Sequence, residues 1–296
     1  MTTSRPASAP LTPILLVLVT GFLLAGMDSL AKWLSAAGLP VLLVLWGRYF
    51  FHAFLTFIGY AVARRSVGFL RARHPGLQFV RAACLFGGTS SLYFSLQHLD
   101  IAEASSIQFL APVLITAISG MFLGEHVGPR RWIAVMIAFA GVLVVARPGS
   151  GVLGFWALLP FITAVLLAIY MILTRTIRSK DDPATTTFYS TAVGAVALTI
   201  MLPAVWEPVP VALWPFIVLT GAAGAAGHYL LVRAFQVAEA SMLAPFTYSQ
   251  VVAAVFWGVV IFGAIPSVWT IVGASMIVGS GIYVWYRESL AAKRGA

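Results

Sequence analysis

The chain has 296 residues, 60% of them hydrophobic and only 9% charged, and its formal net charge is +9. Soluble domains carry about 25% charged residues. This chain therefore has too little charge to cover a surface that faces water, and its composition predicts a protein that lies mostly in lipid. Its Lys and Arg residues lie in short segments between apolar runs, which argues against a nucleic-acid partner. The single cysteine, Cys84, lies in an apolar run, so neither a disulfide framework nor a thiolate metal site is expected.

Apolar runs long enough to cross a bilayer follow one another along the chain. Because a spanning helix needs about 20 residues, this pattern predicts an all-α integral membrane protein with ten transmembrane helices. Clusters of Pro, Gly and charged residues separate the runs, and no connection is long enough to form a separate soluble domain. The predicted spans are 11–36, 40–63, 76–98, 103–123, 130–147, 152–175, 184–205, 211–235, 241–263 and 266–286.

The first run follows Arg5, as the apolar part of a signal sequence would. It contains Asp28 and Lys32, lacks a convincing cleavage site and is followed by further spans, so we interpret it as a retained helix. Cytoplasmic loops of membrane proteins are enriched in Lys and Arg. If both termini are cytoplasmic, Lys32 and Arg147 are the basic residues left in the outer loops. The sequence therefore predicts this orientation.

The tetrapeptide AEAS occurs twice, at 102–105 and at 238–241. Tyr93 and Tyr229 precede the two copies by the same distance. Five predicted spans lie in each half of the chain, and because five is odd, the second half must enter the membrane from the opposite side. This pattern predicts two inverted five-helix repeats, an arrangement found in many secondary transporters. The predicted repeats are 11–147 and 152–286.

Each AEAS copy lies at the start of an apolar run. The first N–H groups of a helix have no partner within the helix, and the helix dipole is positive at that end. A glutamate in the first turn, Glu103 or Glu239, suits both conditions, and the small Ala and Ser residues allow close helix contact. A helix start is the simpler interpretation. The alternative is that Glu103 or Glu239 binds the substrate or carries a coupling proton.

The segment FLAPVLITAISGMFLGEHVGPRRWIAVMIAFAGVLVV at 109–145 resembles the second half of an EamA repeat, from the drug/metabolite transporter superfamily. The resemblance covers both halves of the chain and therefore nearly all of it. The second copy departs from the pattern, since Tyr248 replaces proline and FGA at 262–264 replaces LGE. The matching features are the first AEAS, Pro112, LGE at 123–125, Trp132 and Gly141.

Within this superfamily the chain most resembles YddG-type exporters of amino acids, aromatic ones especially. The resemblance implies alternating access through a central cavity, with the two repeats moving against each other. It also implies a multi-pass protein of the bacterial inner membrane and export as the direction of transport. Nucleotide sugars and phosphorylated metabolites are handled by other members of the superfamily.

Charged groups inside a bilayer are costly and usually face a cavity or a partner. Asp28 and Lys32 lie four residues apart on one face of the first span, so their spacing predicts an ion pair near its outer end. The alternative is that Asp28 carries a coupling proton. Arg48 and His52 repeat this spacing in the second span. The family fold implies a peripheral position for that helix, so we expect a packing or interface role for both.

Polar and aromatic residues recur at helical spacing in the third, fourth, eighth and ninth spans, with further candidates in the sixth. An amino-acid substrate needs hydrogen-bonding groups for its polar ends and an apolar or aromatic surface for its side chain. Each residue alone is explained more simply by a hydrogen bond to a neighbouring helix, but as a converging set they predict a cavity. The predicted substrate-binding residues are Thr89, Tyr93, Gln108, Thr163, Tyr170, His228, Tyr248 and Gln250.

No motif indicates catalysis or a cofactor. GSGVLG at 149–154 fits a dinucleotide-binding pattern, but it joins two spans and no strand precedes it. We therefore expect a secondary transporter without cofactors that exports aromatic or neutral amino acids and related metabolites. The alternatives are a transporter of nucleotide sugars or drug-like cations, a membrane enzyme acting on lipid-linked substrates, and a membrane scaffold. A monomer and a homodimer both stay open.

Overall fold

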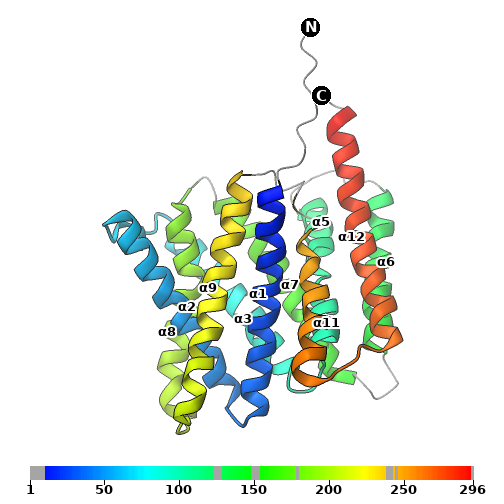
Figure 1. Ribbon diagram of the computed structural model, residues 1–296. Coiled ribbons are helices and arrows are strands. Elements are labelled where there is room, and N and C mark those ends of the chain that lie inside the picture. Colours follow the sequence, from blue (N-terminus) through cyan, green and yellow to red (C-terminus); the bar gives the residue numbers. More distant parts are fainter. Residues whose placement is uncertain are drawn as a thin grey trace.

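The computed structural model describes residues 11–122, 129–147, 154–177, 180–237, 243 and 246–294. The described residues form a bundle of α-helices joined by short turns and 3₁₀ segments (Figure 1). The prediction of an all-α membrane protein is confirmed. By length and composition, five described helical segments are long and apolar enough to cross a membrane: 11–36, 41–64, 155–174, 183–204 and 211–234.

The helices of the first half are α1 (Leu11–Ala36), α2 (Val41–Arg64), α3 (Pro75–Ser95), α4 (Ile101–Gln108), α5 (Ala111–Phe122) and α6 (Pro129–Ala146). Those of the second half are α7 (Leu158–Ile177), α8 (Pro183–Val205), α9 (Trp214–Val237), α11 (Ser249–Phe262) and α12 (Val268–Arg294). Short 3₁₀ segments η1 (Gly68–Leu70), η2 (Gly154–Ala157) and η3 (Val211–Leu213) lie in the connections.

Local chemistry explains several helix boundaries. Pro75 and Pro183 occupy first-turn positions of α3 and α8, where a missing N–H costs nothing. The Asp182 carboxylate caps α8 by accepting a hydrogen bond of 2.8 Å from the Ala184 N–H. Gly263 ends α11 at a φ of 64°, a conformation that a residue without a side chain adopts freely.

The two halves of the chain are interlocked. α1 packs against α9 and α11, α2 against α8 and α9, α3 against α7 and α8, and α6 against α12. The start of α1 and the end of α12 lie at the same end of the bundle (Figure 1). The halves therefore pass through the bundle in opposite directions, as the inverted-repeat prediction requires.

The structure modifies the predicted spans at three places. The predicted span 103–123 is interrupted between α4 and α5, because Pro112 lacks an N–H and its ring clashes with the carbonyl four residues earlier. In the predicted span 241–263, a turn at Tyr248 precedes α11. The last helix continues beyond the predicted end at 286, to Arg294.

A buried arginine ties three helices together at one end of the bundle. The Arg81 guanidinium on α3 donates to Gln78 Oε1 at 3.1 Å, to Thr174 Oγ1 at 3.2 Å and to Ser190 Oγ at 2.8 Å, and also to the carbonyl of Thr186. Its carbon Cζ lies 5.0 Å from the centre of the Tyr170 ring. Arg81 is 1% exposed, so its charge is stabilised entirely by these partners.

Replacing Arg81 by lysine should lower the free energy of unfolding by about 1–2 kcal/mol, because an ammonium cannot reach the same set of acceptors. The measurement is the unfolding temperature in detergent, with Arg65→Lys as the control, since Arg65 is an exposed cation nearby. Equal unfolding temperatures for both variants would mean that the Arg81 network does not hold the helices.

Candidate functional site

A cluster of buried and half-buried polar and aromatic side chains lies in the middle of the bundle, where α1, α2, α3 and α9 meet. α2 and α9 come close together because α9 has glycines at the contact. A Cβ atom on Gly224 would lie 2.9 Å from His52 Nδ1, and one on Gly221 would lie 2.9 Å from the His52 backbone nitrogen. The members of this central cluster are Asp28, Arg48, Tyr49, His52, Tyr93 and His228.

An arginine and an aspartate face each other within this cluster. Arg48 Nη1 lies 3.9 Å from Asp28 Oδ1, and both side chains are nearly shielded from solvent. The guanidinium carbon of Arg48 lies 5.1 Å from the Tyr93 ring centre and 5.7 Å from that of Tyr49. In the described part of the chain, Arg48 Nη1, Asp28 Oδ1 and the Tyr93 hydroxyl make no hydrogen bond of normal length. The pair is therefore loose and keeps hydrogen-bonding capacity on both of its charges.

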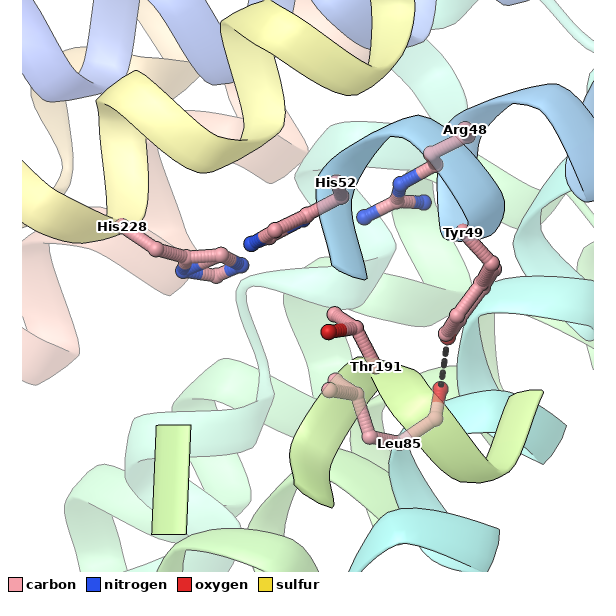
Figure 2. A pocket seen from close by; sticks show the side chains of 6 residues that line it. All are labelled: Arg48, Tyr49, His52, Leu85, Thr191 and His228. Carbon is pink, nitrogen blue, oxygen red and sulfur yellow. Dashed lines mark hydrogen bonds between the residues drawn. The ribbon is translucent and has the colours of Figure 1, made fainter. Parts of the chain in front are cut away.

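Two histidines extend the cluster toward α9. The rings of His52 and His228 are stacked, with 5.1 Å between their centres and 29° between their planes. Figure 2 shows the two rings pointing toward each other across the space between α2 and α9, while the Tyr49 side chain points toward Leu85. The Tyr49 hydroxyl donates to the Leu85 carbonyl at 3.3 Å.

The cavity at this cluster is small. It measures about 10 Å³ and is lined by Arg48, Tyr49, His52, Leu85, Thr191 and His228. A volume of 10–15 Å³ holds about one water molecule. The structure thus shows the centre closed, and an organic substrate would enter only after the helices separate.

The interrupted helices contact each other at their breaks. The rings of Phe109, at the break between α4 and α5, and Tyr248, at the turn before α11, lie 5.7 Å apart. Tyr248 is buried against Gly281 of α12, where any Cβ atom would overlap its hydroxyl. Gln108 is half-buried at the end of α4. Backbone that leaves the helical path in this way often lines a substrate pathway in transporters.

The structure brings only some of the predicted residues together. Tyr93 and His228 lie in the central cluster, and Thr89 is buried one turn before Tyr93 on α3. Thr163 is engaged elsewhere, since its hydroxyl donates to the carbonyls of Gly88 at 2.9 Å and Leu159 at 3.0 Å. Tyr170 lies against Arg81.

Gln250 lies at the start of α11, where that helix packs on α1. A Cβ atom on Gly21 would lie 3.1 Å from the Gln250 backbone nitrogen. This contact is between helix backbones. The binding role predicted for the Gln250 side chain stays a prediction.

The predicted ion pair of Asp28 with Lys32 is wrong. Lys32 Nζ donates to the Leu99 carbonyl at 2.6 Å and lies 3.4 Å from Asp100 Oδ1, at the outer end of the bundle under the predicted orientation. Spacing along one helix made the pair with Lys32 possible, but the neighbouring helix α2 supplies Arg48 at the depth of Asp28.

The first AEAS copy begins a helix. The Glu103 carboxylate accepts a hydrogen bond of 3.3 Å from the Asp100 backbone N–H, which completes a capping box at the start of α4. This contact supports the helix-start interpretation of Glu103. Glu239 and the second AEAS copy lie outside the described residues.

Three members of the cluster, Arg48, Tyr49 and His52, were predicted neither to bind substrate nor to carry a coupling proton. The sequence does contain a signal, because an arginine and a histidine four residues apart in a predicted span are unusual in lipid. The expectation of a peripheral α2 concealed this signal. In the structure one face of α2 contacts α8 and α9, and that face carries the three residues into the bundle.

Tyr93→Phe should leave the unfolding temperature unchanged, because the buried Tyr93 hydroxyl makes no hydrogen bond of normal length among the described residues. It should reduce transport several-fold, because it removes a hydroxyl that is available to a substrate. Gln108→Ala tests the break between α4 and α5 in the same assay. Initial rates in proteoliposomes, normalised to reconstituted protein, give the comparison. Wild-type rates in both variants would remove these two positions from the substrate pathway.

An interlocked helical bundle with a loosely paired polar centre and interrupted helices has features that recur in membrane transporters. The EamA-like transporter family matches this chain over residues 11–147 and 154–286, so the chain belongs to that family.

Curated relatives of this chain are small-molecule transporters. A riboflavin transporter of Brucella anthropi is 26% identical, over 90% of this chain and 95% of its own length. An S-adenosylmethionine uptake transporter of Rickettsia bellii is 24% identical, over 75% of this chain and 76% of its own length. The pseudopaline exporter CntI of Pseudomonas aeruginosa is 25% identical, over 90% and 93%.

A solved crystal structure has the same fold. It aligns with a TM-score of 0.65 at 22% identity and covers 97% of this chain and 99% of that chain. The family and the relatives identify a multi-pass membrane transporter of small molecules. They do not single out amino-acid export.

Proposed function

We propose that this protein exports amino acids, or small metabolites that carry an amino-acid group, across the bacterial inner membrane by alternating access. The observation that carries this proposal is the loose Asp28–Arg48 pair in the central cluster. At neutral pH an amino acid carries one ammonium and one carboxylate group. A buried aspartate and a buried arginine offer each of these groups a partner of opposite charge.

Replacing the contact between Asp28 and Arg48 by contacts of each residue with a substrate is energetically favourable. A buried ion pair is stable only if further hydrogen bonds satisfy its atoms, and here Arg48 Nη1 and Asp28 Oδ1 lack them. A zwitterion that enters between the two residues would supply the missing partners. Arginine holds carboxylates through two parallel hydrogen bonds, which also orients the ligand.

The rings around the pair suit an apolar or aromatic side chain. Tyr49 and Tyr93 flank Arg48, and His52 stacks on His228. Separation of α2 from α9 would part the two histidines and open a space between flat rings. Export as the direction rests on the resemblance to amino-acid exporters.

Uptake into proteoliposomes tests the substrate class. The panel contains labelled phenylalanine, leucine, riboflavin, S-adenosylmethionine and a nucleotide sugar, with and without a pH gradient. We expect saturable transport of phenylalanine and leucine that unlabelled amino acids inhibit. N-acetylated phenylalanine, which lacks the ammonium group, and phenylalaninol, which lacks the carboxylate, should both compete poorly.

Transport of riboflavin alone would contradict the amino-acid proposal and leave the transporter class intact. A transport rate that is the same with and without the pH gradient would exclude proton coupling through Asp28. The direction of transport is tested separately. Cells with and without the protein are loaded with a dipeptide, and the efflux of the amino acids released from it is compared. Equal efflux would contradict export.

A further inference from the structure

A second polar site lies at one end of the bundle, away from the central cluster. The connection between α2 and α3 and the connection between α7 and α8 form a hollow of about 390 Å³ there. The positive-inside prediction places this end in the cytoplasm. The hollow is lined by Gly68, Arg71, Arg73, Lys180, Asp181, Asp182 and Thr185.

Hydrogen bonds hold the two connections together and engage both aspartates. Asp181 accepts from the backbone N–H groups of Arg73 at 2.7 Å and His74 at 3.4 Å, and from Gln78 Nε2 at 3.0 Å. Asp182 accepts from Arg64 at 2.5 Å and caps α8. Its hydrogen bond to Arg64 holds the pKa of the Asp182 carboxyl below its ordinary value. Every carboxylate oxygen lining the hollow thus already has a donor.

The cations lining the hollow make no ion pair with the described residues. Arg71, Arg73 and Lys180 are exposed, and none of the ion pairs or side-chain hydrogen bonds found in the described part of the chain uses their charged groups. Within the part of the chain that the structure describes, the buried hydroxyl of Thr185, whose residue is only 1% exposed, also lines the hollow and has no hydrogen-bond partner. Three cations and a buried hydroxyl without partners among the described residues are suited to a phosphate group, which offers several acceptor oxygens.

The surroundings favour a phosphate that belongs to a lipid. Val67 precedes η1 and Leu70 ends it, so both are chain neighbours of residues that line the hollow, and they are 54% and 37% exposed. Two further apolar side chains, Phe79 and Val80 on α3, are 60% and 51% exposed. Basic pockets beside transmembrane helices on the cytoplasmic side are suited to anionic headgroups. A soluble phosphate compound has no acyl chains that would cover the apolar rim.

We propose that this hollow binds the phosphate of an anionic phospholipid headgroup, with Arg71, Arg73, Lys180 and the Thr185 hydroxyl as ligands. The acyl chains lie along the apolar rim at Val67 and Leu70. The bound lipid bridges the α2–α3 and α7–α8 connections and so ties the first repeat to the second.

The test uses the full chain in a non-ionic detergent and follows its unfolding temperature during titration. The probes are dioctanoyl phosphatidylglycerol, dioctanoyl phosphatidylcholine and inorganic phosphate. We expect a saturable rise with phosphatidylglycerol and a much smaller one with phosphatidylcholine. A rise with inorganic phosphate at similar concentration would assign the same site to a free phosphate and contradict the lipid as its source.

Variants locate the binding. Arg71→Gln, Arg73→Gln and Lys180→Gln, singly, should each weaken phosphatidylglycerol binding severalfold, and together at least tenfold. Thr185→Val keeps the shape and removes the hydroxyl, and should also weaken binding. Arg65→Gln is the matched control, because it removes one exposed cation from the same surface without lining the hollow.

Folding of the variants is checked by their unfolding temperature without lipid. This temperature should stay within a few degrees of wild type, since the three cations have no other partner found in the described part of the chain. The proposal is overturned if no probe raises the unfolding temperature. It is also overturned if the triple variant retains the wild-type response, or if Arg65→Gln loses as much as Arg71→Gln.

Discussion

Replacing both members of the central pair, as Asp28→Asn with Arg48→Gln, should lower amino-acid transport at least tenfold and leave the protein folded. The double variant removes two charges that lie 3.9 Å apart; Asn has the size of Asp, and Gln is a neutral amide somewhat shorter than Arg. Replacing both partners of a buried ion pair is often neutral for stability. Loss of a charged hydrogen-bond partner costs binding about 1.5–3 kcal/mol, which corresponds to a factor of ten or more in affinity.

Comparison with the single variant Arg48→Gln separates a role in transport from a role in folding. Arg48→Gln alone leaves the buried Asp28 carboxylate without a counter-charge, which costs a folded protein about 3–5 kcal/mol. We therefore expect the single variant to lose both transport and yield, and the double variant to recover yield without recovering transport. The measurements are the unfolding temperature and the initial rate in proteoliposomes. Wild-type transport in the double variant would show that the pair has a structural role only.

Gly273→Leu should destabilise the protein by about 3 kcal/mol, because overpacking here would force helix backbones apart. α6 and α12 cross at two glycines. A Cβ atom on Gly141 would lie 2.8 Å from the Gly273 carbonyl oxygen, and a Cβ atom on Gly273 would lie 3.1 Å from the Val145 backbone nitrogen. Close backbone contact of this kind is a main source of helix association in lipid.

Gly279→Leu is the matched control for this prediction. Gly279 lies on the same helix, and a Cβ atom there would meet nothing within 4 Å. Unfolding temperature and the fraction of monodisperse protein after gel filtration compare the two variants. If Gly279→Leu were as harmful as Gly273→Leu, the cause would be the loss of glycine from α12 and not the crossing with α6.

The fold was predictable because lipid imposes a simple rule on the sequence. Apolar runs must be long enough to cross a bilayer, and turn residues interrupt them. The predicted span 11–36 coincides with α1, and Pro75 and Pro183 mark helix starts. The break between α4 and α5 could have been predicted from Pro112 but was hidden within a continuous apolar run.

The central cluster was only partly predictable. Tyr93 and His228 were found from helical spacing, but the partner of Asp28 depends on which helix packs beside α1 and at what height. That information lies in contacts between distant segments, such as those of α2 with α8 and α9. Spacing within one helix favoured Lys32, whereas packing between helices supplies Arg48. Pairing between helices cannot be derived from the periodicity of either helix alone.

The interlocked packing has a consequence for synthesis. Helices α1 to α6 leave the ribosome before the helices that pack on them. The packing partners of α1 are α9 and α11, and the partner of α6 is α12, all of which are made later. During that interval Asp28 and Arg48 lie in the membrane with only each other as counter-charge, and His52 has not yet met His228. Pairing two opposite charges within the half that is made first keeps this unfinished intermediate tolerable in lipid. Insertion of α12 then supplies the packing partner of α6.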